Sequence, residues 1–165
     1  MPRVHMVKKA RKDNPAVKKG EPYYYWTFRY GGKRYSATYP RPSQLTQSEF
    51  LSQIYSFAEE CEDFKVDDSD PVAAMEELQS FAESMADQIE ELGEEQQSKK
   101  DDLPENFQEG PTGQLFESRY DACEEMASTL RDIDFDIDED LSDEEKQARL
   151  EEALGEVQNV SYDGE

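Results

Sequence analysis

Two long stretches of the chain carry apolar residues at alternating spacings of three and four, which is the pattern of a helix that buries one seam. The first seam comprises Met75, Leu78, Ala82, Met85, Ile89 and Leu92, and the second comprises Phe116, Tyr120, Cys123, Ala127 and Leu130. Between them lie two groups of helix-breaking residues, at 101–104 and 110–113, which contain Pro104, Gly110, Pro111 and Gly113. The pattern therefore predicts an antiparallel helical hairpin over residues 72–137.

Shorter apolar seams predict one helix on either side of this hairpin. Thr46-Gln47-Ser48-Glu49 has the spacing of a capping box, and the helix after it would bury Phe50, Ile54, Phe57, Cys61 and Phe64. A second capping box, at residues 142–145, predicts a C-terminal helix over 143–157 with Leu150, Leu154 and Val157 inward. Pro71 suits the first turn of the long helix. We expect a helical bundle over 43–160 and a tail over 161–165.

The clearest strand pattern lies in residues 23–40, where two aromatic-rich runs flank Gly31-Gly32. Such a two-residue connection is typical of a type I′ hairpin turn. The resulting alternation gives one aromatic face, with Tyr24, Trp26, Phe28, Tyr30, Tyr35, Ala37 and Tyr39. The opposite face is polar and basic, with Tyr25, Thr27, Arg29, Arg34, Ser36 and Thr38. Because a lone hairpin is marginal in water, we expect the aromatic face to pack on helices. The predicted fold is mainly α with a two-stranded hairpin, in the α+β class.

Residues 132–138 alternate strictly between aspartate and an apolar side chain. The alternation fits a short strand or extended segment with four aspartates on one side. The same residues also fit the frayed end of the preceding helix, because Leu130, Ile133 and Ile137 remain in register. Of the two interpretations, we favour the extended one.

Charge divides the chain into a basic beginning and a long acidic remainder. The net charge is −22, yet the first 44 residues carry eleven Lys or Arg against two acidic residues, Asp13 and Glu21. Residues 1–22 hold much of this positive charge and are predicted to be a flexible basic arm. The acidic remainder should repel nucleic acid and anionic membranes and attract a protein with a basic groove.

The chain lacks the residue patterns of a catalytic or metal site. Its only histidine, His5, lies on the predicted arm, so a nucleophile would have no histidine base. A calcium loop starting at Asp132 would place Ile137 where glycine is required and Asp143 where glutamate is required. We therefore expect no enzyme activity, no cofactor and no metal. Cys61 and Cys123 are expected to be reduced and buried.

Two surfaces remain as candidate binding sites. Carboxylates one helical turn apart repeat at ~5.4 Å, and those on one side of a strand at about 6.7 Å, which is close to the spacing of successive phosphates. The candidate acidic site comprises Glu83, Asp87, Glu90, Glu91, Glu94, Glu95, Asp132, Asp134, Asp136 and Asp138. The candidate nucleic-acid site comprises Lys8, Lys9, Arg11, Lys12, Arg29, Lys33 and Arg34, with Tyr25 available for base stacking.

Four stretches resemble a family of small acidic tailed-phage proteins of unassigned function: KKARKDNP (8–15), YGGKRYS (30–36), RPSQLTQS (41–48) and LPENFQEGPTGQL (103–115). The resemblance extends over nearly the whole chain and implies a phage-encoded protein that acts in the bacterial host cytoplasm. It implies no catalytic residues. The aromatic hairpin is also similar to the arm-binding sheets of phage integrases, which have three strands where two are predicted here. The acidic body is similar in composition to phage DNA-mimic inhibitors.

Our leading hypothesis is a non-catalytic phage inhibitor whose acidic helical surface mimics nucleic acid. Its partner would be a host or defence protein with a basic nucleic-acid-binding groove. The alternative is a nucleic-acid-binding accessory protein that uses the basic arm and hairpin, while the acidic body recruits a protein partner. A third hypothesis is an inert structural or assembly role. No run approaches the ~20 apolar residues of a membrane span, so we expect a cytoplasmic protein without a membrane partner.

Overall fold

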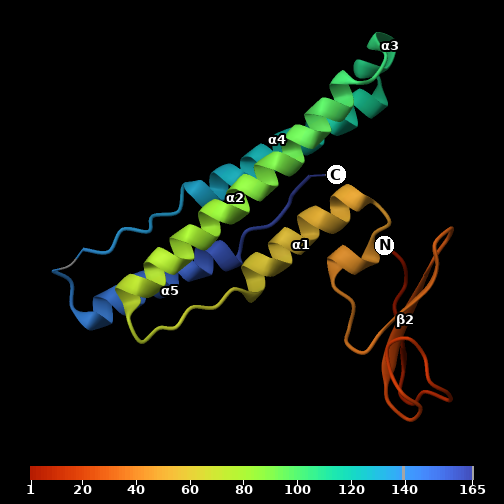
Figure 1. Ribbon diagram of the computed structural model, residues 1–165, viewed down its shortest axis with the longest axis horizontal. Coiled ribbons are helices and arrows are strands. Elements are labelled where there is room, and N and C mark those ends of the chain that lie inside the picture. Colours follow the sequence, from red (N-terminus) through yellow and green to blue (C-terminus); the bar gives the residue numbers. More distant parts are fainter. Residues whose placement is uncertain (139, 165) are drawn as a thin grey trace. The chain divides into compact units, whose positions relative to one another are not determined.

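The computed structural model describes residues 1–138 and 140–164 and is mainly helical, with a small antiparallel sheet near the N-terminus (Figure 1). This confirms the predicted fold class. The chain divides into two compact units, Met1–Ser56, called the N-terminal unit, and Phe57–Glu165, called the C-terminal unit. The division falls within α1 (Glu49–Asp63), so the two halves of this helix belong to different units.

The sheet has three strands instead of the predicted two: β1 (His5–Val7), β2 (Tyr23–Phe28) and β3 (Gly32–Ser36), in that spatial order. The prediction of a flexible arm over residues 1–22 is therefore wrong for β1, which pairs antiparallel with β2. Beyond β1 the backbone N–H of Ala10 donates to the carbonyl of Glu21 at 2.9 Å, which prolongs the pairing. Backbone pairing satisfies the donors and acceptors that a free arm would leave to water.

The turn between β2 and β3 also differs from the predicted one. It consists of Arg29, Tyr30 and Gly31, and Gly32 begins β3 with a φ of 75°. Glycine adopts this left-handed conformation at little cost because it has no Cβ atom. Phe28 therefore lies opposite Gly32, whereas a two-residue turn would place it opposite Tyr35. The pairing of β3 with β2 is thus displaced by three residues from the predicted register. Because three is an odd number, every β3 side chain lies on the face opposite to the predicted one.

The inner face of the sheet carries Trp26, which belongs to the core of the N-terminal unit. Trp26 is 3% exposed, and Leu45, Phe50 and Ile54 are buried in the same unit. Leu45 ends the 3₁₀ helix η1 (Pro42–Leu45). The hydroxyl of Ser48 accepts the backbone N–H of Leu51, so Ser48 caps α1 rather than the predicted Thr46. Tyr30 and Tyr39 were predicted to pack on helices but are 84% and 64% exposed.

The predicted helical hairpin forms the body of the C-terminal unit. Its two arms are α2 (Pro71–Asp101) and α4 (Pro111–Arg131), which pack side by side in Figure 1. All six predicted seam residues of α2 are buried, as are Cys123, Ala127 and Leu130 of α4. The short helix α3 (Glu105–Gln108) lies in the connection, and α4 begins earlier than the breaker pattern predicts because Pro111 occupies its first turn.

The chain after α4 has no regular secondary structure over residues 134–138. The side chains nevertheless alternate as the sequence predicts: Ile133 is buried, whereas Asp132, Asp134, Asp136 and Asp138 are exposed. Helix α5 (Asp143–Gln158) then begins at the predicted capping box, in which Ser142 and Glu145 bond reciprocally. In the predicted tail, Tyr162 is only 8% exposed. Glu165 lies outside the described residues.

Within the described part of the chain, every helix is too short or too polar to cross a lipid bilayer.

Candidate nucleic-acid interface and acidic surface

The strand register assigns the side chains of the sheet to two faces, because residues directly opposite each other in antiparallel strands share a face. The face opposite Trp26 is called the outer face. Its members come from all three strands: His5, Val7, Tyr23, Tyr25, Thr27, Lys33 and Tyr35. Four of these seven side chains are aromatic rings, and a fifth is a cation.

The rings of the outer face lie next to one another across the strands. His5 stacks on Tyr25, with ring centroids 5.0 Å apart and an interplanar angle of 15°. Tyr23 lies 6.3 Å from Tyr25 and 6.0 Å from Tyr35, again between centroids. Because one ring comes from β1, two from β2 and one from β3, the cluster depends on the third strand.

Lys33 adds positive charge to this aromatic cluster. Its ammonium nitrogen lies 3.7 Å from the centroid of Tyr25 and 5.3 Å from that of Tyr35. The negative face of an aromatic ring attracts a cation at such distances. His5 and Lys33 are exposed, and the three tyrosines are half-buried. The outer face therefore presents ring surface and positive charge together.

The other predicted basic residues flank the sheet. Lys8, Lys9, Arg11 and Lys12 are exposed and lie in the connection between β1 and β2. Arg29 lies in the turn between β2 and β3, where its guanidinium is 5.3 Å from the ring of Tyr30. The N-terminal unit carries eleven basic and three acidic residues, a net charge of +8.

Arg34 was predicted on the same face as Tyr25. It lies instead on the inner face, where it is the cross-strand neighbour of Trp26. There it lines a groove of about 580 Å³ together with residues of η1 and the start of α1. The other lining side chains are mostly amides and hydroxyls, among them Ser43, Gln44, Gln47, Ser52 and Gln53. Trp26 also lines this groove, and its indole N–H has no acceptor among the described residues.

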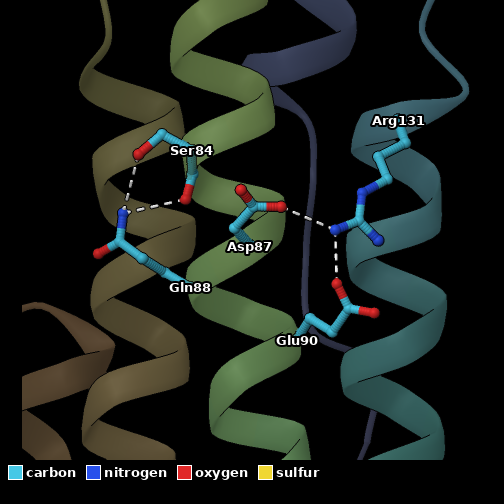
Figure 2. A network of polar contacts seen from close by, with 5 residues as sticks. All are labelled: Ser84, Asp87, Gln88, Glu90 and Arg131. Carbon is cyan, nitrogen blue, oxygen red and sulfur yellow. Dashed lines mark hydrogen bonds and ion pairs between the residues drawn. The ribbon is translucent and has the colours of Figure 1, made fainter.

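The acidic candidates on α2 lie mainly on its solvent-exposed side. Glu83, Asp87, Glu91, Glu94 and Glu95 are exposed, and Glu90 is half-buried. Figure 2 shows Arg131 reaching from α4 to two of them: its guanidinium lies 2.8 Å from the carboxylate of Asp87 and 2.5 Å from that of Glu90. These two hydrogen-bonded carboxylates raise the pKa of Arg131 above its ordinary value.

A groove of about 510 Å³ brings the two predicted acidic rows together. Glu83 and Asp87 line it from α2, while Asp134 and Asp136 line it from the segment after α4. Arg149 of α5 binds Asp134 at 2.6 Å. The pKa of Asp134 lies below its ordinary value, first because its carboxylate accepts the backbone N–H of Asp136 and then because of Arg149.

Basic side chains of the same unit already neutralise part of the acidic site. Of the ten predicted residues, Asp87 and Glu90 pair with Arg131, Asp134 with Arg149, and Glu95 with Lys99. Asp132 lies apart from the groove that holds Asp134 and lines a different depression with Glu152 and Glu156. The sequence therefore overestimates the continuous negative charge that this surface offers.

Both cysteines are free and buried, as predicted. Burial raises the pKa of Cys61 to about 11, with a smaller contribution from the charge of Glu60, and burial alone raises the pKa of Cys123 to about 12. The thiols therefore remain protonated at neutral pH. Within the described residues, no group of three or more potential ligands could hold a metal ion.

Three members of the outer-face cluster were not among the predicted site residues: His5, Tyr23 and Tyr35. The sequence contains the rings but not the register that brings them to one face. Comparison of the chain with protein-family models, curated proteins and solved structures finds no match. Its function must therefore be inferred from its own residues.

Proposed function

We propose that this protein binds nucleic acid through the outer face of its three-stranded sheet. The observation that supports the proposal is the cluster of His5, Tyr23, Tyr25 and Tyr35 with Lys33 on a single face. Sheets that bind nucleic acid present aromatic rings to bases and cations to phosphates. This proposal takes up the nucleic-acid-binding part of the alternative that the sequence offered, without its recruitment of a protein partner by the acidic body.

The inner face explains why the outer rings are not needed to fill the core. Trp26, on the inner face, is 3% exposed and supplies the buried aromatic side chain of the sheet. The tyrosines of the outer face keep part of their surface in contact with solvent. Cross-strand pairing of such rings stabilises a sheet by about 0.2–1 kcal/mol per pair. Lys33 lies over the Tyr25 ring through a cation–π contact, and this contact leaves a positive charge beside exposed ring surface, where an anionic ligand with bases can meet both.

The charge of the whole chain does not prevent local binding. Charges separated by more than about 10 Å in ~0.1 M salt are largely screened from one another. The N-terminal unit, which contains the outer face, has a net charge of +8 and by itself attracts a phosphate. The acidic C-terminal unit would instead limit nonspecific adhesion to nucleic acid elsewhere on the surface.

The test is a titration of labelled single-stranded and duplex oligonucleotides with the full-length protein over a salt series. The matched variant changes Lys8, Lys9, Arg11 and Lys12 to Gln, because deletion of residues 1–22 would also remove β1. The logarithm of the binding constant falls linearly with the logarithm of the salt concentration. Neutralising four phosphate contacts should make this slope shallower by about 3 for a single strand. Absence of binding to either oligonucleotide at low salt would overturn the proposal.

The C-terminal unit supports a second candidate function, in which its acidic surface mimics nucleic acid and occupies a basic groove of a host or defence protein. The observation that favours it is the groove that gathers Glu83, Asp87, Asp134 and Asp136. Helix α2 holds two of these carboxylates in place, so a basic partner would gain the counterion release it normally gains from DNA.

Charge reversal tests this second function. Glu83→Lys, Glu91→Lys and Glu94→Lys together should abolish salt-sensitive capture of a nucleic-acid-processing protein from nuclease-treated bacterial lysate. Reversal of the exposed residues Glu105 of α3 and Glu109, which follows α3, provides a control and should leave capture unchanged. Equal capture by both reversed proteins would refute mimicry by this surface.

A further inference from the structure

We propose that the outer face binds single-stranded nucleic acid, with unpaired bases stacked on Tyr23, Tyr25 and Tyr35. This inference rests on the proposed function and specifies the class of nucleic acid. It follows from the spacing of the rings, from the side chains that surround them and from the position of Lys33.

The spacing of the rings suits bases that have left a continuous stack. Tyr23 lies 6.3 Å from Tyr25 and 6.0 Å from Tyr35, measured between ring centroids. Successive bases in one strand of a duplex are only about 3.4 Å apart. Neighbouring rings on the outer face can therefore each receive a base only when those bases are separated, as in a single strand.

The side chains of the outer face are suited to stacking on the flat faces of bases rather than to hydrogen bonding with their edges. Side chains that read a duplex in the major groove make paired hydrogen bonds to base edges, and arginine, lysine, asparagine and glutamine are the usual ones. The outer face offers only Lys33 from that set, together with Thr27. In a duplex the faces of the bases are covered by their neighbours, so three tyrosine rings gain contact only with bases that are unpaired.

Lys33 supplies the cation that a bound strand needs. In the free protein its ammonium group covers the ring of Tyr25 at 3.7 Å from the centroid. A base that stacks on this ring takes the place of the ammonium group, which then pairs with the adjoining phosphate. The ring and the charge are thus used together, and the free protein keeps both in place by their mutual attraction.

The experiment compares a labelled oligothymidine with a hairpin duplex of equal nucleotide number, both titrated with the full-length protein. Tyr25→Leu and Tyr35→Leu should each weaken binding of the single strand by roughly 5- to 150-fold, the loss expected for one stacked base. Tyr25→Phe keeps the ring and should keep the affinity. Tyr30→Leu is the matched control, because Tyr30 is 84% exposed in the turn and does not belong to the outer face.

The outcomes separate this inference from the proposed function. Tighter binding of the single strand, lost in the leucine variants but kept in Tyr25→Phe and Tyr30→Leu, supports the inference. Equal affinity for both probes, unchanged by Tyr25→Leu, overturns stacking while leaving nucleic-acid binding in place. Failure to bind either probe overturns both. The emission of Trp26, buried on the inner face, verifies that each variant is folded.

Discussion

Gly93 is the position at which the helical hairpin is most directly open to test. It lies on α2 and is buried against α4, and a Cβ atom added there would lie 2.9 Å from the Cβ of Cys123. Real Cβ atoms do not approach each other so closely, so either helix must move in a Gly93→Ala variant. Gly155 of α5 is a matched control, because a Cβ added there meets nothing within 4 Å.

The two alanine variants share one energetic term and differ in the other. Alanine in place of glycine inside a helix is worth about 1 kcal/mol in helix propensity. Overpacking a core by one methyl-sized group typically costs about 1–3 kcal/mol. Gly155→Ala should therefore stabilise the protein by up to about 1 kcal/mol, and Gly93→Ala should be less stable than Gly155→Ala by about 1–3 kcal/mol.

The assay is urea unfolding followed by far-ultraviolet circular dichroism, which reports on the helices. Gly93→Ala should unfold at a lower urea concentration than Gly155→Ala, with an unchanged dependence of the unfolding free energy on urea. If both substitutions stabilised the protein equally, α2 and α4 could not be packed as closely at Gly93 as the structure shows. The close contact between the two helices would then be refuted.

Three further predictions concern buried and capping groups. Gln96 is 1% exposed, and its amide nitrogen has no hydrogen-bond partner among the described residues. Gln96→Leu should therefore raise the unfolding free energy, measured by urea titration, by about 1–3 kcal/mol. A decrease would mean that the amide is hydrogen-bonded. Burial raises the pKa of Cys61 to about 11 and that of Cys123 to about 12. Both thiols should therefore resist alkylation at about pH 8 until the protein unfolds, which mass spectrometry would show. Rapid labelling of the folded protein would contradict their burial. Hydrogen bonds from Ser142 lower the pKa of Glu145, so their stabilisation is present above its unfolded value of about 4.3 and is lost as pH falls through the lower folded value. Unfolding free energies measured between about pH 3 and 6 should consequently depend less on pH in Ser142→Ala, and an unchanged profile would exclude this link.

The helical hairpin could be predicted because its signal is long and repeated. Six apolar positions on α2 fix one buried seam, and Pro71 indicates where α2 begins, whereas Pro111, which the pattern places among the helix breakers, begins α4. Gln96 occupies the same heptad position as Ile89 and is equally buried, yet its polarity hides it from a hydrophobic pattern. Pattern reading thus gives the element and its buried side but not every member of the core.

The sheet could be predicted only in part. β1 contains three residues, His5, Met6 and Val7, which are too few to show a strand period, and a long connection separates it from β2. The pair Gly31-Gly32 indicates a turn but not its length. Because one additional or missing turn residue moves side chains between faces, the outer-face cluster could not be derived from the sequence.

The acidic residues show a different limit of sequence reading. Their helical spacing predicts exposure, and the structure places most of them at the surface. The spacing contains no information on Arg131 and Arg149, which lie far along the chain from α2 and neutralise Asp87, Glu90 and Asp134. Sequence alone therefore identifies the acidic helix but not which of its carboxylates a partner would meet.

The most direct test of nucleic-acid binding by the outer face is a map of backbone and tyrosine-ring chemical shifts by nuclear magnetic resonance. The full-length protein would be titrated with a short oligothymidine. If bases stack on the outer face, the shifts of Tyr23, Tyr25, Lys33 and Tyr35 change together, while those of the buried seam of α2 remain in place. Shift changes confined to other parts of the molecule, or no changes at all, would contradict binding at this face.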